Sequence, residues 1–351
     1  MTLPALVRLG DLTGGRDNNF QLLRFLAAGA VLVFHCYALT DRWTDEPLWR
    51  LAHELDLGSL GVKVFFVVSG FLVTQSWVTR RRLDQFVVAR ALRIYPALLV
   101  ATLWTIALAA LSSRVPFLGF VAHPQTGSYL LHTALGLDVR DSLPGAFTTN
   151  PFPHSVNGSL WTLPIELRLY LAIAIGGVAG LVTRRAAWLG ALAALCVVFV
   201  VKPAWLTTLL PGGDVPHLAQ LALCFGLGSL AYVWRDALPL SLAGAAACVA
   251  LVAWNPAGLA REALFPVLLV YVVLVAAYDP RLRFRAFNRI GDYSYGLYVY
   301  AFPIQQTIVQ RAPGIEPPLL LAYAFPVALA MAVLSWHAIE QPALGLKSRF
   351  D

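Results

Sequence analysis

The stretch from Asn18 to Leu39 reads NNFQLLRFLAAGAVLVFHCYAL, and the interpretation of the whole chain depends on it. It is long enough to cross a bilayer, because about 20 apolar residues at about 1.5 Å each span the hydrocarbon core. Two polar residues, Arg24 and His35, interrupt it eleven positions apart. On an α-helix they would share one face to within about 20° and differ in depth by about 16 Å.

Two interpretations of this pair are open. In the first, Arg24 reaches the membrane surface along its own stem and His35 hydrogen-bonds to a neighbouring helix. In the second, both residues serve a site inside the membrane, where a charged side chain costs about 2.5 to 3.5 kcal/mol and is kept for a function. The stretch by itself favours neither.

The composition indicates a membrane protein. Of the 351 residues, 58% are hydrophobic and 13% are charged, whereas soluble domains carry about 25% charged residues. The net charge of +7 would suit nucleic-acid binding, but basic residues also collect in the cytoplasmic loops of membrane proteins. The four cysteines lie in apolar runs without metal-ligand or redox spacing. Neither disulfides nor a metal site is therefore expected.

Ten apolar runs are long enough to cross a membrane, and they predict an all-α polytopic bundle of about ten helices in a lipid bilayer. The runs cover residues 20–39, 60–77, 93–111, 164–182, 187–202, 217–234, 239–255, 262–279, 292–310 and 317–338. The segments between them place sixteen Lys and Arg on the side of the N-terminus and seven on the other side. The positive-inside rule then predicts that both termini are cytoplasmic. Because the basic residues follow the topology and form no single patch, no nucleic-acid partner is expected.

The chain is expected to form one membrane domain over residues 1–351. Residues 1–17 would be a cytoplasmic N-terminal segment without a cleaved signal, and residues 339–351 a cytoplasmic tail. Residues 112–163 would be a long outer loop, rich in Pro, Gly, Ser and Thr and without a convincing helix. A connection of this length is more often functional than filler.

The second predicted span contains VFFVVSGFL, in which Ser69 and Gly70 are the only small residues. Small residues in membrane helices usually allow close helix packing, which is the simpler interpretation. We also consider Ser69 as part of a cofactor-binding site.

The run RRRLDQFVVARALRIYPAL places Arg90 and Arg93 one helical turn apart at the cytoplasmic side, shortly before Tyr95. They would anchor the topology by binding anionic lipid headgroups. The alternative is a docking site for a phosphorylated cytoplasmic cosubstrate, because paired guanidinium groups suit phosphates.

The fourth span follows the sequence NGSLWTLPIELRLY, which contains Asn157, Trp161 and Glu166. Glu166 can simply complement the dipole of the helix start. It would also lie in the outer half of the membrane, as His35 does, where a carboxylate and an imidazole can tune each other's proton affinity. Further along, SYGLYVYAFPIQQ brings tyrosines such as Tyr298 and two glutamines into the ninth span. Tyrosines at helical spacing more often pack against neighbouring helices than line a pocket.

Several motifs, taken in order, resemble the acyltransferase-3 family of membrane-bound bacterial acyltransferases. The chain has neither a G-x-S-x-G serine motif nor a phosphate-binding loop, so neither a covalent serine mechanism nor ATP-driven transport is supported. The matching pieces are Arg24 and His35 with ten residues between them, FFVVSGFL, the RxxRIYP run ending at Pro96, SLWTLPIE ending at Glu166, SYGLYVYAFPIQ, and IEQP at residues 339–342. Each is weak alone, but together they run through almost the whole chain.

The resemblance implies a ten-helix protein of the bacterial inner membrane that transfers an acyl group, usually acetyl, from cytoplasmic acyl-CoA to a hydroxyl of a cell-envelope carbohydrate. Acyl-CoA would be a cosubstrate, and no cofactor would be bound permanently. In the family the arginine and histidine of the first span are essential, which implies the same for Arg24 and His35. Many members carry a histidine where this chain has Ala301, so any contribution of that histidine is absent or supplied elsewhere. The chain ends without the hydrolase-like domain of some members, so direct acylation or transfer through a separate partner is expected.

The expected mechanism uses the two ends of one helix face. His35 would act as general base on the acceptor hydroxyl, Arg24 would hold the donor or stabilise the oxyanion, and Glu166 would orient the imidazole or the acceptor. The donor would contact Arg90, Arg93, Ser69 and Tyr95, and the sugar would contact Trp161, Asn157 and Tyr298. The alternative from another class is a proton-coupled transporter or flippase of an envelope precursor, in which the same ionisable residues line a pathway.

Overall fold

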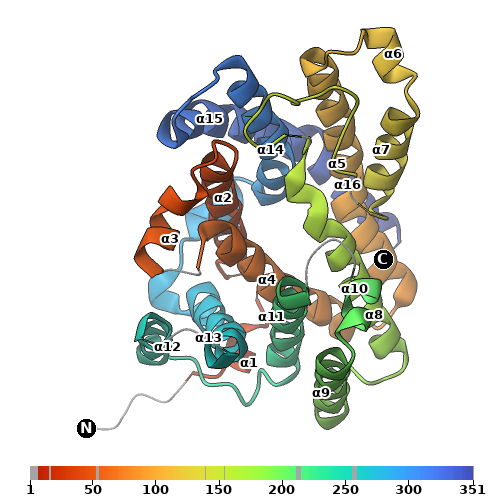
Figure 1. Cartoon of the computed structure of the whole chain (residues 1–351). Coiled ribbons are helices and arrows are strands. Elements are labelled where there is room, and N and C mark those ends of the chain that lie inside the picture. Colours follow the sequence, from red (N-terminus) through yellow and green to blue (C-terminus); the bar gives the residue numbers. More distant parts are fainter. Residues whose placement is uncertain are drawn as a thin grey trace. The chain divides into compact units, whose positions relative to one another are not determined.

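A computed structural model describes residues 7–15, 17–52, 55–138, 140–153, 155–210, 215–254 and 259–350 (Figure 1). Within these ranges all regular structure is helical, and the one backbone bridge, between Arg8 and Pro239, forms no strand. The all-α class predicted from the sequence is therefore confirmed for the described residues.

The α-helices differ widely in length. They are α1 (Leu9–Leu12), α2 (Phe20–Ala38), α3 (Pro47–Ala52), α4 (Leu57–Arg80), α5 (Leu83–Ser112), α6 (Phe117–Val121), α7 (Pro124–Leu135), α8 (Leu163–Val178), α9 (Arg185–Val201), α10 (Pro203–Leu209), α11 (Val215–Val233), α12 (Leu242–Trp254), α13 (Leu259–Tyr278), α14 (Ser294–Arg311), α15 (Pro317–Ser335) and α16 (Gln341–Gly345). Short 3₁₀ turns are η1 (Trp43–Asp45), η2 (Gly158–Thr162), η3 (Pro280–Leu282), η4 (Arg285–Arg289) and η6 (Leu346–Arg349), and η5 (Trp336–Glu340) is a π-helical turn.

Six of the described segments are long and apolar enough to cross a membrane, which makes the chain a multi-pass membrane protein. They are α2, α4, α5, η2 with α8, α11, and the run from α15 to η6. A seventh would be α9 with α10, which meet at an angle of 111°. The other three predicted spans coincide with α12 and α13, whose apolar parts are shorter, and with α14, which carries several glutamines. Ten crossings and cytoplasmic termini stay predictions.

The outer loop differs from its prediction, because residues 112–163 contain α6, α7 and η2. The expectation that no convincing helix lies there is wrong. Local signals mark α7: the His123 side chain accepts a hydrogen bond from the backbone of Gln125, Pro124 opens the helix, and Gly136 closes it at φ +64°. Its twelve residues are too few and too polar for a search based on long apolar runs.

Helix α7 runs back along α5 (Figure 1). The Tyr95 hydroxyl donates to the carbonyl oxygen of Leu135 at 3.2 Å. Tyr95 precedes Ser112, the last residue of α5, by 17 residues, or about 25 Å of helix. The end of α7 therefore lies deep along α5. One buried cluster holds this segment against the last turns of α5: Ala109, Phe120, Tyr129, Leu143, Ala146, Phe147 and Val156.

The chain divides into two compact units. Unit 1 comprises residues 1–24, 62–86 and 168–290, and unit 2 comprises residues 25–61, 87–167 and 291–351. Four helices, α2, α4, α5 and α8, contribute residues to both units. Each unit is described separately below.

In unit 1, α4 and α11 pack with their backbones nearly in contact. A Cβ atom on Gly70 would lie 2.0 Å from the carbonyl oxygen of Phe225, and one on Gly228 would lie 2.3 Å from that of Val67. Only glycine fits at either position. The packing interpretation of the small residues in VFFVVSGFL therefore applies to Gly70.

In unit 2, α14 is the most deeply buried helix, with an unbroken run of buried residues from Ser294 to Gln306. Gly296 lets it approach α15 closely, because a Cβ there would lie 2.7 Å from the Cα of Ala332. A helix buried on all sides that nevertheless carries tyrosines and glutamines must satisfy their polar groups internally. Those hydrogen bonds shape the site described next.

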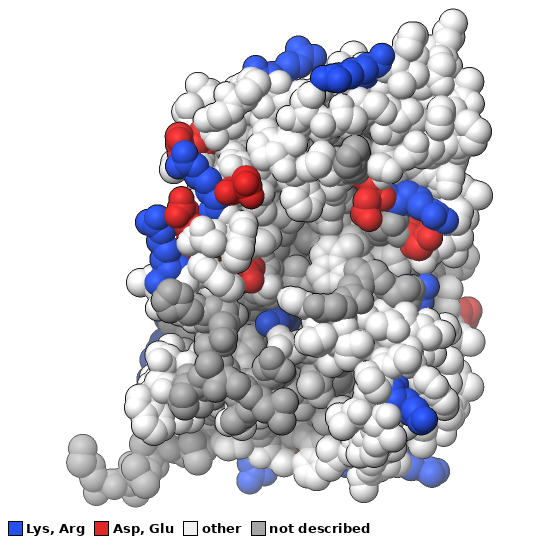
Figure 2. Space-filling model, in the orientation of Figure 1, with Lys and Arg blue, Asp and Glu red and all other residues white. Residues whose placement is uncertain are grey.

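The surface agrees with a membrane environment. On the face shown in Figure 2 most atoms are white, and the charged side chains form a few small separate groups. Large apolar side chains such as Leu26, Leu171 and Val200 are exposed on the helices. Bilayer hydrocarbon is the solvent for which such a surface is suited.

Candidate active site

His35 lies near the end of α2 and opens onto a cavity of about 610 Å³, within the range of about 300 to 1,000 Å³ typical of ligand sites. The lining residues are Phe34, His35, Ala38, Leu39, Asp141, Ser142, Phe152, Pro153, Ser155, Gly158, Trp161 and Phe302. All of them belong to unit 2. The structure thus brings His35 and Trp161, predicted separately from the sequence, to one cavity.

Two aromatic rings orient the imidazole of His35. Its ring meets Phe302 of α14 edge to face, with centroids 4.9 Å apart and planes at 83°, and lies 5.7 Å from the ring of Phe34. The Nδ1 atom of His35 is buried, and no described residue forms a hydrogen bond with it.

Trp161 reaches the cavity from η2, which α14 holds in place. The Tyr298 hydroxyl donates to the carbonyl oxygen of Ser159 and lies 2.7 Å from the Thr162 hydroxyl. Gly158 allows η2 to approach α14, because a Cβ there would lie 2.9 Å from the ring of Phe302. Tyr298 is buried behind the cavity wall. Its direct contact with substrate stays a prediction.

Asn157 also lies behind the wall. It is buried, and its amide donates to the carbonyl oxygen of Val299 at 2.9 Å and to the Thr105 hydroxyl at 3.3 Å. These bonds join η2 to α14 and α5. They make Asn157 a residue that positions Trp161, and its predicted contact with the sugar is untested.

Two buried glutamines of α14 form hydrogen bonds with two segments that line the cavity. The Gln305 amide donates to the carbonyl oxygen of Leu32 at 2.9 Å and to the Cys36 sulfur at 3.0 Å, next to His35 on α2. The neighbouring Gln306 donates to the carbonyl oxygens of Phe152 and Ser155 at 2.9 and 2.7 Å. The Asn150 amide donates to the side-chain and backbone oxygens of Gln306 as well. Sequence reasoning noticed these glutamines but assigned them no role.

Asp141 is the lining residue that sequence reasoning missed. Its side chain is exposed, and partial desolvation of the carboxyl raises its pKa. Its backbone oxygen accepts a hydrogen bond from the Val156 amide at 2.8 Å. The adjacent Ser142 receives the Gln125 amide at 2.8 Å. No sequence signal distinguishes Asp141 from other loop aspartates, because only the folded loop brings it to His35.

The remaining acid–base candidates lie apart from this lining. Arg24 is half-buried on α2, the unbroken helix that also carries His35, as predicted. Glu166 is half-buried in the first turn of α8 and lies near enough to the Tyr298 hydroxyl to interact with it electrostatically. The predicted proximity of Glu166 to His35 stays a prediction.

Arg93 takes part in a buried ionic network. Its guanidinium lies 2.8 Å from Asp292 and 3.3 Å from Glu340, with side-chain exposures of 16%, 8% and 1% in that order. The ring of Tyr295 lies below it, at 5.7 Å. These contacts connect α5 with the start of α14 and the end of η5. Arg90 is half-buried one turn earlier on α5, and the donor-binding role of both arginines is untested.

The other two residues assigned to donor binding are placed by hydrogen bonds within their own units. The Ser69 hydroxyl lies 3.1 Å from that of Tyr170 in unit 1. Tyr95 of unit 2 bonds to the end of α7, as described above. Among the described residues, no group of three or more His, Cys, Asp or Glu side chains could hold a metal ion.

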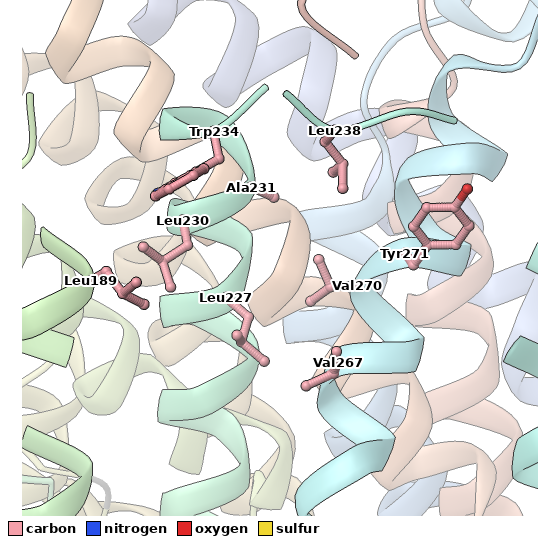
Figure 3. Close-up of a pocket in the computed structure, with 9 residues that line it drawn as sticks. All are labelled: Leu189, Leu227, Leu230, Ala231, Trp234, Leu238, Val267, Val270 and Tyr271. Carbon is pink, nitrogen blue, oxygen red and sulfur yellow. The ribbon is translucent and has the colours of Figure 1, made fainter. Parts of the chain in front are cut away.

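A second kind of pocket lies in unit 1, where α11, α13 and Leu189 of α9 enclose about 400 Å³ (Figure 3). Its side chains are aliphatic apart from Trp234 and Tyr271. The Tyr271 hydroxyl is already bonded, to the Ser241 amide at 3.1 Å and the Pro239 carbonyl at 3.2 Å. This pocket therefore offers shape but no acid or base.

The comparison with known families supplies the class of reaction. The family model described as an acyltransferase domain matches residues 17–337. The chain belongs to this acyltransferase family. The match confirms the resemblance inferred from the motifs, and it includes every residue that lines the His35 cavity.

Curated relatives of this acyltransferase agree. An O-acetyl transferase of Shigella phage Sf6 is 27% identical over 349 residues, which cover 93% of this chain and 96% of the relative. Nodulation protein 10 of Rhizobium leguminosarum bv. viciae is 30% identical over 373 residues, 96% and 95% of the two chains. The acyltransferase MdmB of Streptomyces mycarofaciens is 37% identical over 101 residues, 28% and 24% of the two chains. No solved structure matches the chain.

Acyl transfer needs an acyl donor, an acceptor and a group that removes the acceptor's proton. Among the described residues that line the cavity, His35 and Asp141 have side chains that can serve as acid or base. Histidine is the most frequent general base in enzymes.

Proposed function

We propose that this acyltransferase moves an acyl group, in the first instance acetyl, from cytoplasmic acyl-CoA to a hydroxyl of a cell-envelope or exported carbohydrate. The acceptor oxygen attacks the thioester carbonyl while His35 takes its proton. The tetrahedral intermediate collapses, the C–S bond breaks, and the CoA thiolate takes the proton from the imidazolium. The products are an O-acyl sugar, CoA thiol and neutral His35.

The observation that carries this proposal is the environment of His35. His35 lines a cavity large enough for a sugar unit, and its perpendicular contact with Phe302 orients the imidazole there. Trp161 and Phe152 add flat apolar surface to the same cavity. Aromatic faces of this kind suit the C–H faces of a pyranose, whose hydroxyls point outward to polar groups.

The donor approaches the other end of α2 in this proposal. Arg24 lies about 16 Å from His35 along the helix axis, and it holds the pantetheine end or stabilises the oxyanion. Arg90 and Arg93, with Ser69 and Tyr95, receive the remainder of acyl-CoA. Glu166 orients the imidazole or the acceptor, and Asn157 and Tyr298 complete the acceptor side.

The proposed location in the cell follows from the predicted membrane topology. The enzyme is a single domain over residues 1–351, embedded in a bacterial inner membrane with both termini in the cytoplasm. In this orientation, α2 places Arg24 toward the donor and His35 toward the outside. The excess of Lys and Arg on the N-terminal side supports this orientation. The match of one family model to residues 17–337 supports one domain.

The direct test uses purified protein in lipid nanodiscs, radiolabelled acetyl-CoA and a panel of methyl glycosides of common hexoses. Wild type should form labelled O-acetyl glycoside and release CoA thiol. His35→Ala should lower kcat by about 10² to 10⁴, the usual contribution of a positioned base. His217→Ala, a change at an exposed histidine of α11, is the matched control and should retain the wild-type rate.

Two results would contradict the proposal. One is a His35→Ala protein that is folded and present in normal amounts but keeps full activity. The other is a wild-type protein that neither binds acetyl-CoA nor labels any glycoside, which would favour the transporter interpretation.

A further inference from the structure

The cavity that His35 lines also contains a carboxylate whose chemistry the transfer step does not use. Asp141 and His35 line the same cavity but come from different parts of unit 2, the loop after α7 and the end of α2. We propose that Asp141 is the acceptor-anchoring residue, which accepts a hydrogen bond from one sugar hydroxyl and thereby decides which neighbouring hydroxyl faces His35. This inference rests on the proposed function and adds to it the determinant of acceptor specificity.

The carboxylate of Asp141 is not used to hold the loop together. No described residue forms a hydrogen bond or ion pair with it. Asp138, three residues earlier, behaves in the opposite way: it lies 2.5 Å from His132 and 3.3 Å from Arg140. Asp141 is exposed on the cavity lining, so its carboxylate is open to accept a hydrogen bond from a molecule that enters the cavity.

The loop holds Asp141 rigidly at the cavity. Its own carbonyl is bonded to the Val156 amide, and the side chain of Gln125 bonds to both oxygens of Ser142, at 2.8 and 3.2 Å. Gln306 fixes the far side of the same loop. A backbone held this way fixes where the side chain of Asp141 begins, so that less conformational entropy is lost when the carboxylate binds.

The surrounding surface fits a sugar better than a flat apolar acceptor. Trp161, Phe152 and Phe302 supply apolar faces, and Asp141, Ser142 and Ser155 supply polar groups on the same cavity. A carboxylate accepts stronger hydrogen bonds from hydroxyls than a neutral group does. A site built to bond one hydroxyl also rejects the analogue that lacks it, because the carboxylate is then covered by the bound acceptor and left unpaired.

The test measures acetyl transfer by protein in nanodiscs to a methyl glycoside that wild type acetylates and to its monodeoxy analogues. Asp141→Asn keeps the shape of the side chain, and Asp141→Ala removes it. Both should raise the KM for the glycoside about tenfold or more, the effect of losing a hydrogen bond to a charged group. The KM for acetyl-CoA should stay unchanged, and the product should change from one positional isomer to a mixture.

The deoxy series identifies the partner hydroxyl without relying on a variant. Wild type should discriminate strongly against one deoxy position besides the acetylated one, and that discrimination should disappear in Asp141→Asn. Asp45→Asn, which affects an exposed carboxylate paired with Arg50, is the control and should behave as wild type.

The outcomes separate the two proposals. If wild type acetylates the glycoside and Asp141→Asn does so with the same KM and the same isomer, this inference is overturned and the proposed function stands. The inference is equally overturned if wild type tolerates every deoxy position other than the acetylated one. If wild type acetylates no glycoside at all, the proposed function fails, and the role of Asp141 fails with it.

Discussion

The apolar pocket of unit 1 and the His35 cavity of unit 2 have comparable volumes, about 400 and 610 Å³, and opposite walls. Around the first, polar groups are few and already bonded, as the hydroxyl of Tyr271 is. Around the second, His35 has a buried ring nitrogen to which no described residue forms a hydrogen bond, and Asp141 has an exposed carboxylate. Volume alone therefore does not distinguish a site from a packing gap. Leaving polar atoms unbonded in a protein interior costs free energy, so the presence of such atoms distinguishes a site from a packing gap.

The same contrast extends to the buried helices. Unit 1 joins α4 to α11 through glycines and apolar contacts, whereas unit 2 buries α14 with its glutamines and holds α5 to it through Arg93. A polar interior must be matched atom by atom. Changes in unit 2 should consequently have larger effects than similar changes in unit 1.

The largest effect on stability is expected from Arg93→Gln. Removing this guanidinium breaks its ion pairs with the buried carboxylates of Asp292 and Glu340, and breaking a buried pair typically costs about 3 to 5 kcal/mol. Thermal unfolding in detergent should show a clearly lower Tm than wild type. Arg82→Gln, which removes an exposed pair with Asp84, is the control, since such pairs contribute about 0 to 1 kcal/mol. An unchanged Tm together with a raised KM for acyl-CoA would instead favour the donor-docking role.

A smaller effect, on activity alone, is expected from Ala38→Leu. Ala38 lines the His35 cavity at the end of α2, and a larger side chain there occupies acceptor space. The KM for the glycoside should rise about tenfold, equivalent to about 1.4 kcal/mol, while the Tm stays close to that of wild type. Steady-state kinetics with varied glycoside at saturating acetyl-CoA measures this. Unchanged kinetics would mean that the cavity is not the acceptor site.

The smallest effect is expected from the matching change in unit 1, Ala231→Leu. Ala231 points into the apolar pocket between α11 and α13 (Figure 3), and filling such a space typically stabilises by about 0.5 to 2 kcal/mol. The Tm should stay equal or rise, and both KM values should stay at the wild-type level. Lost activity at normal stability would show that the pocket takes part in the reaction, and the comparison between the two units would then fail.

Much of the fold and part of the site were predictable because their signals are local. Arg24 and His35 share α2 because helical periodicity relates residues on one continuous segment. The helix α7 was missed because its capping signals are short and its residues are mixed in polarity. Arg93 was predicted either to bind lipid headgroups or to dock a phosphorylated cosubstrate. Its ionic partners Asp292 and Glu340 were not predicted because they are about 200 and 250 residues away in the chain.

The sequence by itself determined that this protein is a helical membrane acyltransferase, and it identified His35 and Trp161 as members of its candidate site. Hydrophobic run length, charge distribution and ordered motifs contain that information because each depends on neighbouring residues. Only the tertiary structure decided that Asp141 faces the cavity of His35, that Gln305 and Gln306 hold its two walls, and that Arg93 is paired. These facts depend on hydrogen bonds between distant segments, and the free energy of burying polar groups selects such bonds only once the helices have packed.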